Sequence, residues 1–197
     1  MLVFYEERLV LLSAPKTAST AYQAALSDRA DLVVTNPPEL KHLTVRRFDR
    51  FFQNMFRKMF DAEMEIMGIV REPIDWLGSW YRYRSRAELI GHPNATHDLS
   101  FDAFVRAYLS PRRPAFADFG TQAAFFQPRS NGAGVTHLFR YESQDKILAF
   151  LQERLSCEIN PPRLNVSPKR TLDLSDDMRK RYMAVHSDDF RLHDSAQ

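Results

Sequence analysis

The stretch from residue 9 to residue 20, Leu9-Val-Leu-Leu-Ser-Ala-Pro-Lys-Thr-Ala-Ser-Thr20, constrains the fold more than any other part of this sequence. An apolar run rich in Val and Leu predicts a buried strand, and Pro15 ends it. The pattern Ala21-Tyr-Gln-Ala-Ala-Leu26 predicts a helix directly afterwards. A loop between a strand and a helix presents free backbone N–H groups at the positive end of the helix dipole. The stretch is therefore suited to hold a phosphate or a sulfate, with Lys16 as a mobile cation.

A second strand followed by a helix is predicted over Ile66-Met-Gly-Ile-Val-Arg-Glu-Pro-Ile-Asp-Trp-Leu-Gly-Ser-Trp-Tyr-Arg82. The apolar run ends at Arg71, and Pro73 suits the first turn of a helix because its missing N–H costs nothing there. Arg71 is therefore expected at the carboxyl edge of a sheet, where open α/β sheets bind ligands. Ser79 is expected about two turns into the helix.

Further strands are predicted at 31–35 and 135–141, and further helices begin at Thr44, Ser100, Ser143 and Ser175. Alternating strands and helices predict an α/β fold, with a mainly parallel central sheet flanked by helices in three layers. A chain of 197 residues suffices for one domain, 1–197. In the helix that begins at Thr44, one face is expected to pack into the core: Val45, Phe48, Phe52, Met55 and Met59.

Composition excludes several classes of protein. The net charge of +2 gives no reason to expect non-specific nucleic-acid binding, and no apolar stretch approaches the length of a membrane span. The single cysteine, Cys157, excludes an internal disulfide. The first eight residues do not resemble a signal peptide, so we expect a soluble, cytoplasmic protein.

Two of these segments resemble motifs of one enzyme family. Pro-Lys-Thr-Ala-Ser-Thr, residues 15–20, resembles the 5′-phosphosulfate loop of sulfotransferases that use 3′-phosphoadenosine 5′-phosphosulfate (PAPS), roughly PK(T/S)(G/A)(S/T)T. The segment 66–82 resembles the 3′-phosphate motif of the same family, roughly VR(D/E)PxxRxxSxY. Glu72 replaces the commoner Asp, and Trp76 stands where an Arg is common. Both motifs occur in the expected order.

The resemblance implies a P-loop-NTPase-like fold and a reaction that needs no metal. It implies that the 5′ end of PAPS is bound by Lys16, Thr17, Ala18, Ser19 and Thr20, with Lys16 also catalytic. Arg71 and Ser79 would bind the 3′-phosphate. A late basic loop commonly closes the nucleotide site in this family, which makes Lys169 and Arg170 further candidates. The acceptor is expected to be a hydroxyl, on a sugar or glycan.

A base must take the proton of the acceptor hydroxyl, and His has the appropriate pKa range. We choose His42, which follows the second predicted strand, in the part of the chain where similar carbohydrate sulfotransferases often place a catalytic His or Glu. The alternative interpretation of His42 is an ordinary residue at a helix start. The other residues considered are Lys41, Glu39 and Glu72 as reserve bases, His92 and His97 in a substrate lid, and His137 as a satisfied sheet residue.

Two other functions stay open at this point. A P-loop kinase or other NTPase would bind ATP with magnesium, but its GxxxxGK[ST] motif requires glycines, and none occurs between Met1 and Met67. A non-catalytic module could instead bind the nucleotide or an acidic glycan through the basic helix after Thr44. Binding of 3′-phosphoadenosine 5′-phosphate (PAP) without metal would favour the sulfotransferase.

Overall fold

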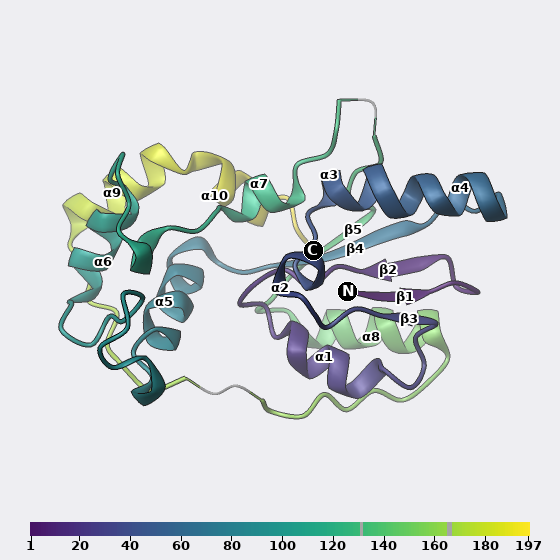
Figure 1. Ribbon diagram of the computed structural model, residues 1–197, viewed down its shortest axis with the longest axis horizontal. Coiled ribbons are helices and arrows are strands. Elements are labelled where there is room, and N and C mark those ends of the chain that lie inside the picture. Colours follow the sequence, from purple (N-terminus) through teal and green to yellow (C-terminus); the bar gives the residue numbers. More distant parts are fainter. Residues whose placement is uncertain (131, 165–166) are drawn as a thin grey trace.

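The computed structural model describes residues 1–130, 132–164 and 167–197, and its centre is a five-stranded sheet (Figure 1). The strands lie in the order β3-β1-β2-β4-β5. Their bounds are β1 Leu2–Phe4, β2 Leu9–Leu11, β3 Leu32–Val33, β4 Glu65–Val70 and β5 His137–Arg140. The α-helices are α1 Ser19–Leu26, α2 Pro38–Lys41, α3 Val45–Phe48, α4 Asn54–Phe60, α5 Pro73–Tyr83, α6 Phe101–Tyr108, α7 Gln122–Phe126, α8 Gln144–Leu155, α9 Asp176–Val185 and α10 Ser187–Asp194. Short 3-10 turns are η2 Ala87–Leu89 and η3 Ala115–Ala117, and a π-helical turn, η1, covers Asp49–Gln53.

The α/β class is confirmed, but the sheet is mixed and not mainly parallel. β2, β4 and β5 are parallel neighbours, whereas β1 pairs antiparallel with both β2 and β3. The expectation of a mainly parallel sheet was wrong because it did not include β1. A hairpin turn joins β1 to β2, and its last residue, Arg8, has φ 53. A turn whose left-handed residue is not glycine gives no clear signal in a sequence.

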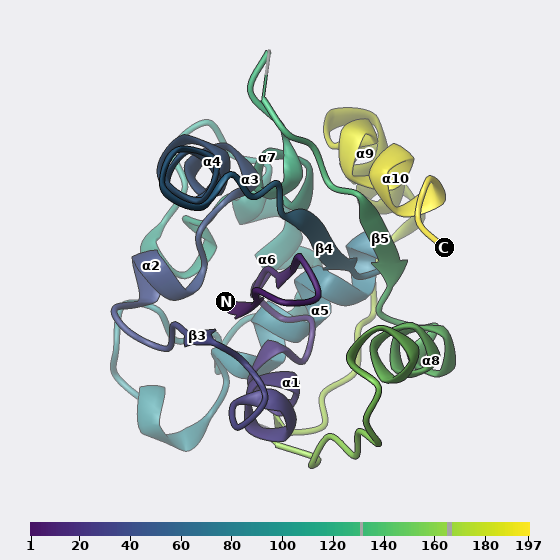
Figure 2. The ribbon, with the colours of Figure 1, turned by 90° about the vertical axis from the view of Figure 1, so that its right-hand side faces the viewer.

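Helices cover both faces of the sheet (Figure 2). α1 and α8 pack on one face, against the side chains of Leu2, Phe4, Leu9, Leu11, Met67, Ile69 and Phe139. α3, α4 and α7 pack on the other, against Val3, Val10, Ile66 and Val70. The alternation along each strand is the period of two expected for a sheet buried on both faces. Gly68 allows α7 to approach closely, because a Cβ there would lie 2.4 Å from the Phe126 ring.

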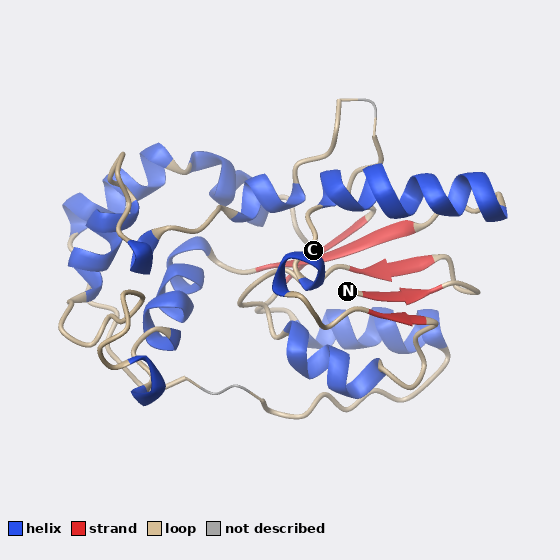
Figure 3. Ribbon diagram, in the orientation of Figure 1, coloured by secondary structure: helices blue, strands red, loops and turns tan. Residues whose placement is uncertain are grey.

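A third apolar core contains no strand and lies beyond the carboxyl ends of the parallel strands, at the left of Figure 3. α5, α6 and α9 contribute most of its fully buried side chains, and Ala117 of η3 contributes another. Aromatic rings pack against each other within it: Tyr81 and Phe104 are tilted, and Tyr108 and Tyr182 meet edge to face. This core fixes α5, the helix that follows the β4 carboxyl end.

The helix that begins at Thr44 is confirmed at its start but not along its whole expected face. The Thr44 hydroxyl caps it by accepting a hydrogen bond from the Arg47 N–H. Val45 and Phe48 are buried as expected, but Phe52 and Met55 are only half-buried and Met59 is 70% exposed. The π-helical turn η1 adds one residue to a turn and rotates the following face, so that Phe56 is buried instead.

The parallel strands β2, β4 and β5 end at the same edge, and the segments that follow them stay in contact. The Leu12 N–H donates to the Met67 carbonyl at 3.0 Å, and the Tyr141 N–H donates to the Val70 carbonyl at 2.7 Å. The loop after β2, Arg71 after β4 and Tyr141 after β5 are therefore neighbours. This is the edge of the sheet at which the sequence predicts the ligand-binding site.

Candidate functional site

Side chains of the segment that follows β4 donate hydrogen bonds to backbone carbonyls of the loop between β2 and α1. The Trp76 indole N–H donates to the Pro15 carbonyl at 2.9 Å, and the Arg71 guanidinium donates to the Lys16 carbonyl at 3.2 Å. Lys16 and Ala18 both have left-handed backbone conformations, with φ 68 and φ 59. Two carbonyls of the loop are thus bound by side chains of the neighbouring segment, and successive left-handed residues of this kind occur in anion-binding loops.

The start of α1 supplies unused donors. Among the hydrogen bonds within the described residues, none is donated by the backbone N–H groups of Ser19 and Thr20. The Thr17 hydroxyl, in contrast, is turned inward, where it donates to the Ala14 carbonyl at 2.9 Å, and the side chain is 1% exposed. Thr17 therefore supports the loop with its side chain. Its expected role in binding is limited to its backbone.

Lys16 lies in an unusually positive environment. Its ammonium nitrogen is 3.5 Å from the centre of the Tyr83 ring and 5.0 Å from that of Trp80, which are cation–π contacts. Burial, and after it the charges of Arg86, Arg71 and Arg84, together lower the pKa of Lys16 to about 7. A desolvated amine among cations is stabilised in its charged form only when an anion arrives.

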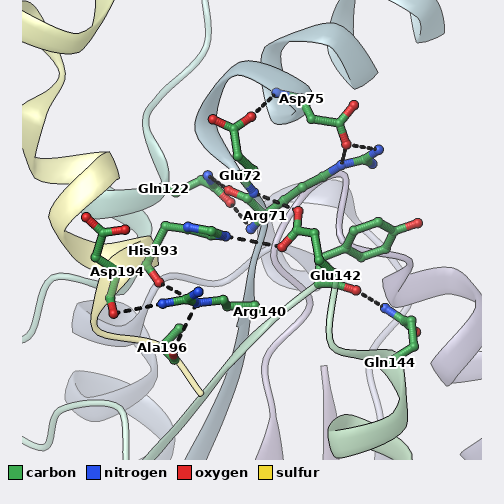
Figure 4. Close-up of polar contacts among 11 residues, drawn as sticks. Arg71, Glu72, Asp75, Gln122, Arg140, Glu142, Gln144, His193, Asp194 and Ala196 are labelled. Carbon is green, nitrogen blue, oxygen red and sulfur yellow. Dashed lines mark hydrogen bonds and ion pairs between the residues drawn. The ribbon is translucent and has the colours of Figure 1, made fainter.

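Arg71 projects into the site from the end of β4 (Figure 4). Two of its nitrogens contact the Asp75 carboxylate at 2.6 Å, and its guanidinium lies 4.4 Å from the centre of the Tyr141 ring. The Gln122 side chain fixes the Arg71 backbone, accepting from its N–H at 2.9 Å and donating to its carbonyl at 2.8 Å. Arg71 is therefore well oriented, but a carboxylate already shares its charge.

His42 is oriented as a base. Its Nδ1 lies 2.7 Å from the Ser13 carbonyl oxygen. Since a carbonyl only accepts, Nδ1 carries the proton and Nε2 keeps a free lone pair. Burial lowers the pKa of His42 below its usual value; the bond to Ser13 opposes this, and the charges of Lys41, the N-terminus and Lys16 add to it. The imidazole is therefore neutral at pH 7 and can accept a proton.

These residues line one cavity of about 510 Å³, here called the loop cavity. Its lining includes Lys16, Ala18, Ser19, Thr20, Lys41, His42, Arg71, Ser79, Trp80, Tyr83 and Arg86. A second cavity of about 660 Å³, the outer cavity, shares Arg71, Ser79, Tyr141, Leu164 and Ser167 with it. Both volumes lie in the range of small-molecule sites. The Lys16 loop and the Arg71 segment, 55 positions apart in the chain, therefore converge on one continuous space.

The late basic loop reaches the outer cavity, but its two cations differ. Lys169 is exposed and lines the cavity. Arg170 also lines it, yet its guanidinium donates to the carbonyls of Thr96, His97 and Leu99 and lies 4.2 Å from the centre of the Tyr81 ring. Arg170 thus anchors the loop to the helical core and also lines the outer cavity. Both cations stay candidates.

The other residues considered as bases or as parts of a substrate lid lie outside the two cavities or bind other groups, with the exception of Lys41. The Glu72 carboxylate caps α5 by accepting from the Asp75 N–H at 2.7 Å, and Glu39 is exposed outside both cavities. His92 and His97 also lie outside the two linings. His137 contacts the Glu65 carboxylate at 2.8 Å, as expected for a satisfied sheet residue. Of the proposed bases, only His42 and Lys41 face the loop cavity.

Several residues of the site were missed by sequence reasoning. Asp75, Tyr83 and Arg86 have no motif that assigns them a role, although Trp76 was noted as a departure and proves to support the loop. The segment Phe139-Arg-Tyr-Glu142 has a structural role: Arg140 binds the carbonyls of His193, Asp194 and Ala196, and Glu142 accepts from the Glu72 N–H at 2.9 Å (Figure 4).

Comparison of the chain with protein-family models, with curated proteins and with solved structures finds no match. No helix in the described part of the chain has both the length and the apolar character to cross a membrane. Among the described residues, no group of three or more His, Cys, Asp or Glu could hold a metal ion. The chemistry of the site must therefore be inferred from its geometry.

Proposed function

We propose that this chain is a PAPS-dependent sulfotransferase that transfers a sulfuryl group to a hydroxyl, on a carbohydrate acceptor. The convergence of the Lys16 loop and Arg71 on one continuous space carries the proposal, because a bisphosphorylated nucleotide must be held at both ends. The cationic lining complements such a ligand. Arg71, Arg82, Arg163, Lys169 and Arg170 line the outer cavity, and no Asp or Glu occurs in the described lining of either cavity.

The residues present fit the donor at its 5′ end better than at its 3′ end. Lys16, with its depressed pKa, and the unused N–H groups of Ser19 and Thr20 suit the phosphosulfate. Arg71 and Ser79 are positioned for the 3′-phosphate, but Asp75 already contacts Arg71. A phosphate there must share the arginine with that carboxylate.

The proposed roles of the residues follow from their geometry. PAPS supplies an activated sulfuryl group whose bond to a 5′-phosphate oxygen breaks in the reaction. His42 Nε2 takes the proton of the acceptor hydroxyl while the acceptor oxygen bonds to sulfur. Lys16 and the loop N–H groups stabilise the charge that develops on the departing phosphate oxygen. The products are a sulfate ester, PAP and a proton on His42.

The proposal also includes a relationship of the fold to P-loop proteins and a location in the cell. The strand β2, the loop and α1 follow each other as in P-loop-NTPase-like proteins, and β2 lies in the middle of the sheet beside β4. We infer a P-loop-like relationship from this arrangement. We also propose that the chain acts in the cytoplasm, without metal, and releases PAP.

A thermal-shift comparison of PAP, ADP and ATP with magnesium tests the proposal. PAP alone should stabilise the protein most, and Arg71→Ala should weaken PAP binding by roughly 2 to 4 kcal/mol, the value of a lost charge-assisted contact. Arg46→Ala, an exposed cation on α3 outside both cavities, is the matched control and should bind PAP normally.

Two outcomes would support other functions. Stabilisation by magnesium-ATP, with no preference for a 3′-phosphate, would indicate a kinase or NTPase and contradict our proposal. PAP binding with unchanged biological activity in Lys16→Ala and His42→Ala would indicate a non-catalytic module. Sulfate transfer from radiolabelled PAPS to a glycan mixture, lost in both variants, would support the enzyme.

A further inference from the structure

Residues 45–60 form one continuous helix, through α3, η1 and α4, along the outside of the molecule (Figure 1). Its inward side packs into the core through Phe48 and Phe56. On its outward side large apolar side chains remain in solvent, where Phe51 is 56% exposed and Met59 is 70% exposed. Large apolar groups that gather on a surface mark sites of interaction.

The outward side consists of two neighbouring stripes, because residues four apart in a helix lie one above another. The apolar stripe is formed by two exposed residues and a half-buried one between them: Phe51, Met55 and Met59. The basic stripe has the same spacing, and all its members are exposed: Arg46, Arg50, Asn54 and Lys58. Arg47, four positions before Phe51, extends the apolar stripe with a further exposed cation.

Negative charge is scarce in this helix. The only acid among residues 45–60 is Asp49, whose carboxylate is 2% exposed and contacts Arg57. Within the described part of the chain, four cations of the helix form no ion pair: Arg46, Arg47, Arg50 and Lys58. The Arg50 guanidinium lies 5.3 Å from the centre of the Phe51 ring, so cationic and apolar groups share one patch. The two stripes together with Arg47 are called the basic apolar face below.

The two stripes together favour one class of partner. A nucleic acid or an acidic glycan would neutralise the cations but leave Phe51 and Met59 in water. A second copy of this chain would cover these apolar side chains but bring the same cations to the interface. An anionic bilayer offers phosphate groups to the basic stripe and acyl chains to the apolar stripe.

We propose that the basic apolar face docks this protein on the surface of an anionic membrane. The helix lies parallel to the bilayer, with Phe51 and Met59 below the headgroups and with Arg50 and Lys58 at the level of the phosphates. Such attachment is peripheral. The inference is independent of the reaction proposed above, because the face lies outside the lining of both cavities.

Flotation with lipid vesicles measures this docking. The protein should float with vesicles of phosphatidylcholine and phosphatidylglycerol, and it should stay unbound with phosphatidylcholine alone. Binding should fall as salt is added, because salt screens exposed charges. The double variant Arg50→Gln and Lys58→Gln should bind roughly thirtyfold more weakly, since each cation near an anionic bilayer contributes about fivefold. The double variant Phe51→Ser and Met59→Ser should lose at least about tenfold, because its apolar stripe can no longer be buried.

Helix α9 supplies the matched control, because it also exposes cations and an apolar side chain. Arg179 and Lys180 are exposed, and Met183 is 45% exposed, but two acids, Asp176 and Asp177, precede them. Lys180→Gln and Met183→Ser should bind vesicles as the wild type does. All variants should melt near the wild-type temperature and respond to PAP as the wild type does, because the substituted side chains are exposed.

Fluorescence shows whether the apolar stripe enters the bilayer. The emission that Phe51→Trp adds to that of the wild type should shift to shorter wavelength on anionic vesicles, and brominated lipids should quench it. An emission that stays at the wavelength of an indole in water, while the protein floats, would contradict insertion of this stripe.

Four other outcomes would overturn the proposal. The first is no flotation with anionic vesicles at low salt, and the second is loss of flotation in the α9 variants. The third is heparin binding as tight as vesicle binding, with both unchanged in the double serine variant, which would indicate a site for soluble polyanions. The fourth is a dimer in sedimentation velocity that dissociates in that variant, without vesicle binding, which would indicate an interface between two copies.

Discussion

The lowered pKa of Lys16 makes nucleotide binding depend on pH in a calculable way. Without a ligand, burial and the neighbouring arginines bring this pKa to about 7. A bound 5′-phosphate favours the charged amine, so the pKa returns toward its ordinary value near 10.5. Above pH 7 the free protein therefore has to take up a proton when it binds PAP.

The size of this effect follows from the free-protein pKa. If the bound form keeps its proton up to pH 9, PAP affinity falls roughly fifty-fold between pH 7 and pH 9, or about 2.3 kcal/mol. The phosphates of PAP do not contribute, because their second ionisation, near pH 6, is complete in this range. Burial lowers the pKa of His42, so His42 does not titrate there.

Isothermal titration calorimetry from pH 6.5 to 9.5, in buffers of different ionisation enthalpy, measures both the affinity and the proton uptake. Lys16→Arg is the matched control, because an arginine keeps its charge over the whole range and should bind PAP with little pH dependence. A wild-type affinity that is as flat as that of the arginine variant, with no proton uptake at pH 8.5, would refute the reasoning.

Three further outcomes are expected. Asp75→Asn should tighten PAP binding by up to about fivefold in titration calorimetry, because Arg71 would no longer share its charge with a carboxylate. The limit follows from the energy of a half-exposed ion pair, which is at most about 1 kcal/mol. Weaker binding would show that Asp75 positions the arginine instead. His42→Gln should abolish the acidic limb of the kcat/KM profile, which lies below pH 6.5 because the pKa of His42 is lowered, and a limb that persists would remove it as the base. Burial raises the pKa of Asp189 from its ordinary value of 3.8 to about 6 in the folded protein. Protonation of Asp189 therefore stabilises the folded state at low pH, and this contribution is lost as pH rises through about 6. Chemical denaturation of Asp189→Asn and wild type should therefore show a stability difference that shifts in favour of Asn by about 1 kcal/mol between pH 5 and pH 7.5; a constant difference would contradict it.

The parts of the site that could be predicted are those fixed by local chemistry. A strand, a proline and a lysine before a helix define the loop, and Arg71 at a second strand end must be its neighbour if the strands are parallel. Thr44, Ser100 and Ser175 were recognisable as helix caps, and each accepts the expected N–H. Such features depend only on residues near each other in sequence.

The remaining features depend on contacts between distant segments. Nothing in the sequence indicates that the Thr17 hydroxyl turns inward or that Arg170 binds three carbonyls of another loop. The rotation of the helix after Phe48 comes from one extra residue in a π turn, which the apolar period does not reveal. Tyr83 and Arg86 enter the site only because α5 has this length and direction.

The amide of Gln122 imitates a missing strand. It meets the N–H and the carbonyl of Arg71 together, in the way that a neighbouring backbone would pair with them. These bonds continue the pairing of β4 one residue beyond Val70, and the partner is the first residue of α7, a helix that packs on the face of the sheet. The Asp189 carboxylate of α10 accepts a hydrogen bond from the Ala123 N–H of α7 at 2.7 Å. Substitutions in α10 can therefore change the position of Gln122, and with it the orientation of Arg71, although α10 does not contact Arg71 directly.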